Sequence, residues 1–166
     1  MSRRAGLERE GNTVSDQARI KGHTVTRTVR IEASRASVWK ALTDPEVMVK
    51  WFGDGVAFAA LEPGATGSID WDDYGSFPIE ITEVVPDSAF SFRWSGIPAE
   101  KLDEYSTHVR FTIADAGTGT DVTVIESGFD TLPGGTLYRR ERLEQNREGW
   151  DVELDELANL LEGVTQ

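Results

Sequence analysis

Between residues 56 and 127 the chain alternates apolar and polar residues in one short segment after another. In "AFSFRW", for example, Phe90, Phe92 and Trp94 alternate with polar residues. A period of two indicates β-strands with one apolar face, and the turn sequences "DDYGS" and "AGTGT" separate such segments. Short connections between strands of this kind predict an antiparallel meander of four or more strands.

Helical patterns flank this meander. The segment 24–31 is a further strand, and a short helix follows it and ends at Asp44. Pro45 then begins a second short helix over 45–52, because proline fits the first helical turn. A long helix is predicted at 138–162, and its apolar stripe consists of Leu143, Trp150, Leu154, Leu157 and Leu161.

The apolar face of the sheet must be covered, and one helix is too narrow to cover six or seven strands. We therefore expect Trp51 and Phe52, at the end of the short helix pair, to fill the space between the sheet and the long helix. Burying such side chains is worth about 1.5–3 kcal/mol each. The order of elements predicts an α+β fold, in which an antiparallel curved β-sheet is wrapped on a long C-terminal helix, with two short helices after strand 1.

Four segments of the chain resemble the helix-grip fold of the START-like superfamily, also called SRPBCC or Bet v-like. They are "RTVRIEASRASVWKALTDPEVMVKWFG", "ITEVVPDSAFSFRWSG", "ESGF" and "NREGWDVELDELANLL". Within the superfamily, the chain resembles the family named for the activator of the heat-shock chaperone ATPase, C-terminal-domain type. The resemblance covers residues 24–162 and implies a single helix-grip domain over 23–163.

The resemblance also implies a cavity between the sheet and the long helix, which in such proteins often holds an apolar or amphipathic small molecule. The residues that it implies as the lining of this cavity are Trp51, Phe52, Trp71, Phe77, Ile79, Ile81, Phe92, Trp94, Tyr105, Thr107, Phe129, Trp150 and Leu154. Buried tryptophan and tyrosine need partners for their polar groups, so this set favours a cavity with polar points.

Composition and charge restrict the partners. Residues 1–22 are a polar leader that we expect to be flexible, and no apolar run approaches the roughly 20 residues of a membrane span. The net charge is −12, and no Lys or Arg occurs between Lys50 and Arg93, which argues against nucleic acid and anionic membranes as partners. The chain has no cysteine, which excludes disulfides and cysteine-based metal sites and favours a cytoplasmic location.

Candidate catalytic residues are few. Of the two histidines, we expect His108 to be exposed on the outer face of the sheet, and we predict no catalytic residue, metal or cofactor. Arg27 and Glu126 are in phase with apolar neighbours. Either they pair inside the domain, or one of them orients a ligand, or each reaches solvent at a strand end. Arg93 and Arg110 are expected at the surface.

Three functions follow as hypotheses. The favoured one is binding of a small apolar or amphipathic molecule in the cavity. The second is a co-chaperone-like module in the stress response, although residues 1–22 are too short to supply the additional N-terminal domain of the full activators. The third is a cyclase-like enzyme for an aromatic or polyketide substrate, which would need inward polar groups such as Tyr105 and Thr107. A homodimer is compatible with a small one-sided sheet.

Overall fold

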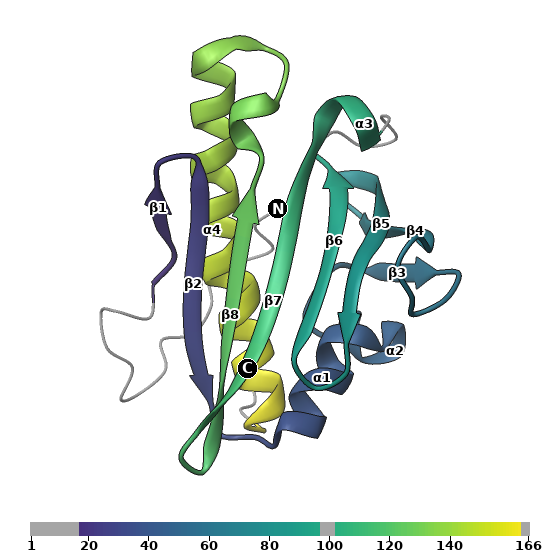
Figure 1. Ribbon diagram of the computed structural model, residues 1–166, viewed down its shortest axis with the longest axis vertical. Helices are drawn as coiled ribbons and strands as arrows, with labels where there is room; N and C mark the ends of the chain where they lie inside the picture. Colours follow the sequence, from purple (N-terminus) through teal and green to yellow (C-terminus); the bar gives the residue numbers. More distant parts are fainter. Residues whose placement is uncertain (1–16, 97–101, 164–166) are drawn as a thin grey trace.

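The computed structural model describes residues 17–96 and 102–163 (Figure 1). Its centre is an eight-stranded antiparallel sheet in the order β1-β2-β8-β7-β6-β5-β4-β3. The strands are β1 (Arg19–Lys21), β2 (Thr24–Ile31), β3 (Gly55–Phe58), β4 (Thr66–Trp71), β5 (Gly75–Val85), β6 (Ala89–Ser95), β7 (Ser106–Ala116) and β8 (Gly119–Ser127). The helices are α1 (Arg35–Thr43), α2 (Pro45–Met48), α3 (Leu102–Tyr105), the short 3-10 helix η2 (Phe129–Thr131) and α4 (Gly135–Leu161). The predicted α+β helix-grip architecture is confirmed.

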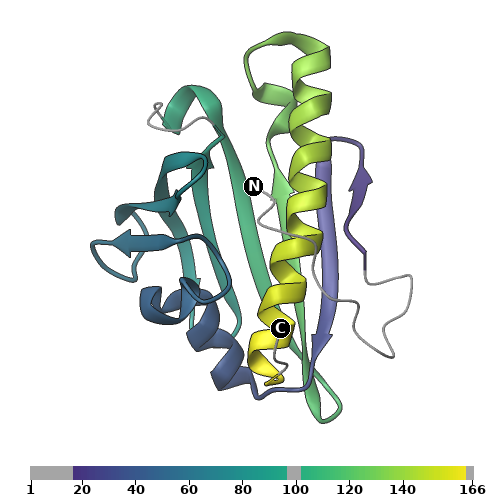
Figure 2. The same cartoon turned by 180° about the vertical axis from the view of Figure 1, so that it is seen from behind.

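The helices that cover the sheet lie on one of its faces. Figure 2 shows α4 running along the sheet over β2 and β8, with α1 beside the C-terminal half of α4 and α2 next to α1. The opposite face carries the ion pairs Arg93–Glu80 and Arg110–Glu83, so the two arginines predicted at the surface lie there. This division follows from the strand alternation, which sends apolar side chains to the covered face.

Trp51 and Phe52 fill the space beside α4. Helix α2 ends at Met48, four residues earlier than predicted, and the amides of Trp51 and Phe52 donate to the Met48 carbonyl at 3.0 and 2.6 Å. Gly53 follows with φ +81°, a left-handed conformation that glycine adopts without strain. Both aromatic side chains are fully buried, and the Trp51 indole donates to the Ala41 carbonyl at 2.8 Å. The prediction that this pair anchors the helices against the sheet is confirmed.

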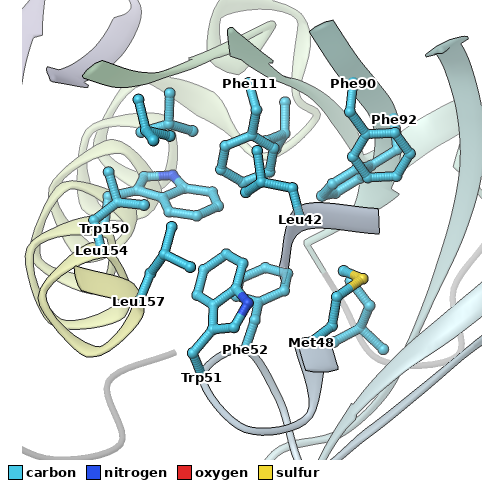
Figure 3. Close-up of a cluster of buried hydrophobic side chains, with 14 of the residues drawn as sticks. Leu42, Met48, Trp51, Phe52, Phe90, Phe92, Phe111, Trp150, Leu154 and Leu157 are labelled. Atoms are coloured by element: carbon cyan, nitrogen blue, oxygen red, sulfur yellow. The ribbon is translucent and has the colours of Figure 1, made fainter. Parts of the chain in front are cut away.

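The interior next to these residues is an aromatic cluster (Figure 3). The ring of Phe52 stacks on Trp51, Trp94 and Trp150, with centroid separations of 5.0, 5.7 and 5.6 Å. Trp71 meets Phe52 edge-on at 5.3 Å. Since aromatic pairs prefer such stacked and edge-on arrangements, the middle of the space between the sheet and α4 is packed with side chains.

The N-terminal boundary differs from the prediction. Strand β1 lies within the segment assigned to the leader, and it pairs with the start of β2. Ala18, before β1, is buried, and its amide donates to Asp151 Oδ1 at 2.6 Å. The expectation of a flexible leader is therefore wrong for residues 19–21, where three residues were too few to show a strand period. Residues 1–16 lie outside the described part of the chain.

The boundaries of two further elements differ from the prediction. Tyr105, predicted in a strand, ends α3, and β7 begins at the next residue, so the Tyr105 side chain is only half-buried. Helix α4 begins at Gly135, three residues before the prediction, and ends at Leu161. The structure thus retains the predicted order of elements, adds one strand before it, and inserts the short helices α3 and η2.

Candidate ligand-binding site

The carboxylate of Glu126 on β8 contacts the aromatic cluster and has no exposed surface. Its Oε1 accepts hydrogen bonds from Trp150 Nε1 at 2.8 Å and Asn146 Nδ2 at 3.0 Å. Its Oε2 accepts from Trp94 Nε1 at 2.9 Å, Thr107 Oγ1 at 2.5 Å and Asn146 Nδ2 at 2.9 Å. The donors come from β6, β7 and α4, so one carboxylate joins three strands and the long helix. We call this set the Glu126 network.

The Glu126 network leaves the carboxylate little further capacity. A carboxylate offers about four lone-pair positions, and the five hydrogen bonds occupy them. Indole and amide N–H groups can only donate, so Trp94, Trp150 and Asn146 match an acceptor. This arrangement stabilises the packing of α4 on the sheet and holds the side chains of Trp94 and Asn146 in place.

Arg27 is also buried, but it has different partners. From β2, its Nη2 donates to Asp155 Oδ1 at 2.6 Å, and its Nη1 donates to the carbonyls of Asp151 and Trp150 at 2.7 and 3.3 Å. Arg27 stands opposite Val124 in the sheet, two register positions from Glu126, so the two side chains meet different turns of α4. The hypotheses that they pair with each other, or reach solvent at strand ends, are therefore wrong.

Next to the Glu126 network is a pocket of about 460 Å³, open at one side. The sheet and its β4–β5 turn contribute Trp71, Tyr74, Phe77, Trp94, Ser95 and Gly96, and α4 contributes Arg142, Gln145, Asn146 and Glu148. Trp94 and Asn146 belong to both the pocket wall and the Glu126 network. One wall is therefore largely aromatic and the other polar, and the shared residues are held in fixed positions.

The residues predicted to line a cavity fall into separate groups. Trp71, Phe77 and Trp94 line the pocket. Thr107 and Trp150 lie behind it in the Glu126 network. Packed in the core are Trp51, Phe52, Ile79, Ile81, Phe92, Phe129 and Leu154. Tyr105 is half-buried at the end of α3 and is not among the pocket residues.

The sequence analysis did not predict the polar wall of the pocket. Asn146 lies three residues after Leu143 and four before Trp150, in phase with the apolar stripe of α4. An amide at such a position must find partners when buried, so Asn146 could have been recognised as a buried polar residue. Arg142, Gln145 and Glu148 carry no comparable signal, because charged and polar residues are frequent on exposed helix faces.

One histidine, His108, lies beside other polar groups on the outer face of the sheet. His108 on β7 is half-buried rather than exposed, and its Nε2 lies 3.1 Å from Thr82 Oγ1. Burial lowers the pKa of His108 below its usual value, and the nearby Glu83 partly opposes this shift.

In residues 17–96 and 102–163, no three described His, Cys, Asp or Glu side chains gather as metal ligands would. No helix in those ranges combines the length and apolar character needed to cross a bilayer.

Comparison with known proteins identifies the family. The family model described as "Activator of Hsp90 ATPase homolog 1-like protein" matches residues 32–162. The chain belongs to this family. A comparison with curated protein sequences found no match.

Several solved structures have a similar fold. DynU16, a protein in the dynemicin biosynthetic locus, is 29% identical with a TM-score of 0.68, and the match covers 86% of this chain and 48% of DynU16. MLL2253 from Mesorhizobium loti is 23% identical, with a TM-score of 0.71 over 86% of this chain and 99% of that one. The Aha1 dimer from Colwellia psychrerythraea is 19% identical, with a TM-score of 0.69 over 86% and 98%. The last two show the fold alone. This family member spans about half the length of DynU16.

Proposed function

We propose that this domain binds a small amphipathic molecule in the pocket between the β4–β6 region and α4. The observation that carries the proposal is the contrast between the two walls, one aromatic with Trp71, Phe77 and Trp94 and one polar from α4. A volume of about 460 Å³ lies within the range of about 300–1,000 Å³ typical of small-molecule sites.

The Glu126 network supports this proposal because it fixes part of the pocket wall before any ligand arrives. Trp94 and Asn146 are each held by a hydrogen bond to a fully buried carboxylate. A preorganised wall loses less conformational entropy on binding, which favours affinity. The similarity to DynU16, in a biosynthetic locus, also supports a small-molecule role.

The same network makes binding a better proposal than cyclase-like catalysis. A general base needs a lone pair within reach of the proton it removes, and the oxygens of Glu126 are occupied by five hydrogen bonds. The chaperone role that the family name indicates is the alternative, and stimulation of a chaperone ATPase by this protein would favour it. A cytoplasmic location and a homodimer stay predictions.

Native mass spectrometry of freshly purified protein, followed by organic extraction, tests the proposal. We expect a retained small molecule that is lost in Gln145→Trp, since this exposed residue of α4 lines the pocket and an indole there would occupy it. The matched control is Glu141→Trp, at an exposed position of α4 that is not among the pocket residues. Equal retention by Gln145→Trp and the unchanged protein would place the molecule elsewhere and contradict the proposal.

A further inference from the structure

We infer that the ligand of this pocket is a planar aromatic carboxylate, with its ring against the tryptophan wall and its carboxylate on the guanidinium of Arg142. The inference rests on the proposed function and specifies its ligand class. It depends on three observations: the hydrogen bonding of Arg142, its contact with Gly96, and the aromatic residues of the pocket.

Arg142 is a half-buried residue of α4 in the pocket wall. Its Nη1 donates to Gln145 Oε1 at 3.1 Å. Among the side chains that the structure describes, no carboxylate lies within ion-pair distance of Arg142, and its Nε and Nη2 have no acceptor there. Nε and Nη2 form one edge of the guanidinium, which binds a carboxylate through two parallel hydrogen bonds.

In this respect Arg142 differs from four other arginines of the chain, which has 29 Asp and Glu against 17 Lys and Arg. Arg27, Arg93, Arg110 and Arg147 all lie within 4 Å of a carboxylate. The other charged residue of the pocket, Glu148, is exposed, and its carboxylate is 3.7 Å from Arg147. Arg147 also lies 2.6 Å from Glu144 and 3.3 Å from Asp151, so it offsets the negative charge of Glu148 only in part. Arg142 is the positively charged residue among the described residues of the pocket wall.

Gly96 allows Arg142 to lie where it does. A Cβ at position 96 would be 2.9 Å from Arg142 Nη2, closer than side chains normally approach. The guanidinium therefore rests against the end of β6, and both residues belong to the pocket wall. A residue with a side chain at position 96 would displace the charge.

The aromatic wall of the pocket suits a planar ring. Trp71 meets Phe77 edge-on with a centroid separation of 5.5 Å, and it is tilted against Trp94 at 5.9 Å. Indole rings in such clusters pack well on further planar rings. A ligand that contacts both the aromatic wall and Arg142 must combine a planar apolar body with an anionic group, which describes an aromatic carboxylate.

Calorimetric titration with two matched probes tests the inference. The probes are naphthalene-2-carboxylate and the uncharged naphthalene-2-methanol. We expect the carboxylate to bind at least about tenfold more tightly, a difference of about 1.4 kcal/mol that a charge-assisted pair supplies. Arg142→Gln should remove this preference, and Arg142→Lys should keep part of it. Arg140→Gln, which makes the same charge change at an exposed position of α4 outside this pocket, should leave the preference unchanged.

Gly96→Ala supplies a second variant that leaves the net charge unchanged. Its Cβ should push the guanidinium aside and lower the preference for the carboxylate several-fold, while binding of the methanol persists. If the unchanged protein binds both probes equally well, or if Arg142→Gln keeps the preference, the inference is overturned and the proposed function stands. If the unchanged protein binds neither probe, the inference is overturned, and the mass-spectrometric experiment decides the proposed function separately.

Discussion

The indole Nε1 of Trp150 donates a 2.8 Å hydrogen bond to Oε1 of Glu126, and this contact ties the long helix α4 to strand β8. Trp150 and Glu126 are both fully buried, so neither can exchange this bond for one to water. The same carboxylate receives donors from β6 and β7. A single acidic residue therefore couples the elements that form the domain core, and its replacement should affect the stability of the whole domain.

Replacing Glu126 with Gln should destabilise the protein strongly. The amide of glutamine would direct N–H groups at Trp150, Asn146 or Trp94, which are donors themselves. Leaving buried polar groups without partners makes a loss of about 3 kcal/mol in unfolding free energy the expected result. Urea denaturation measures it. Glu141→Gln on the exposed side of α4 is the control and should change stability by less than about 0.5 kcal/mol. Equal stabilities of the two variants would contradict the structural role of the Glu126 network.

The two tryptophans that line the pocket should respond differently to replacement by phenylalanine. Trp94 donates to Glu126 and Thr107, so Trp94→Phe should cost about 1.5–3 kcal/mol, the value of a hydrogen bond to a charged group. The buried Nε1 of Trp71 has no acceptor in the described part of the chain, so Trp71→Phe loses ring area but no hydrogen bond. We expect Trp71→Phe to be the milder change in the same denaturation experiment. The reverse order would show that ring packing, and not hydrogen bonding, dominates at both positions.

Arg27 should matter much more for stability than the neighbouring Arg30. Arg27→Met removes the buried donor to Asp155 and to the carbonyls of Asp151 and Trp150. The Asp155 side chain is 23% exposed and regains some water, so we expect a loss of about 2–4 kcal/mol, somewhat below that of a fully buried pair. Arg30→Met is the control, because Arg30 and Glu32 form an exposed pair of the kind worth less than about 1 kcal/mol. Thermal unfolding of the two variants measures the difference.

His108 should make the stability of the domain depend on pH. Burial lowers its pKa, Glu83 opposes this shift, and Arg110 and Arg93 add to it. The unfolded chain keeps the ordinary pKa of about 6.5, so just below this pH it binds more protons than the folded protein. Stability is therefore fully present above pH 6.5 or so and falls as the pH drops through that value toward the folded pKa.

The variant His108→Gln tests this contribution. We expect it to lose less unfolding free energy than the unchanged protein between about pH 7.5 and about pH 5.5, where an ordinary histidine titrates. His23→Gln, at the exposed turn between β1 and β2, is the control and should keep the pH dependence of the unchanged protein. The same loss in His108→Gln and in the unchanged protein would show that other groups cause the pH dependence.

The order of the elements was predictable because strand and helix periods are local properties. The alternation around Phe92 and the stripe that includes Leu154 each record which face of one element is apolar. The short strand β1 and the early end of α2 at Met48 were not predicted, because a few residues show no period and their conformation depends on contacts elsewhere in the domain.

By itself, the sequence determined that apolar side chains such as Trp71 and Trp94 point inward, and it left the direction of Glu126 open. Only the tertiary structure decided their partners. Arg142 and Asn146 reach the pocket because α4 lies over the sheet in one particular register, and Glu126 meets Trp150 and not Arg27 for the same reason. Periodicity reports the face that a residue occupies on its own element, whereas hydrogen bonds and pocket walls arise between elements far apart in the chain, whose relative position depends on the packing of the whole core.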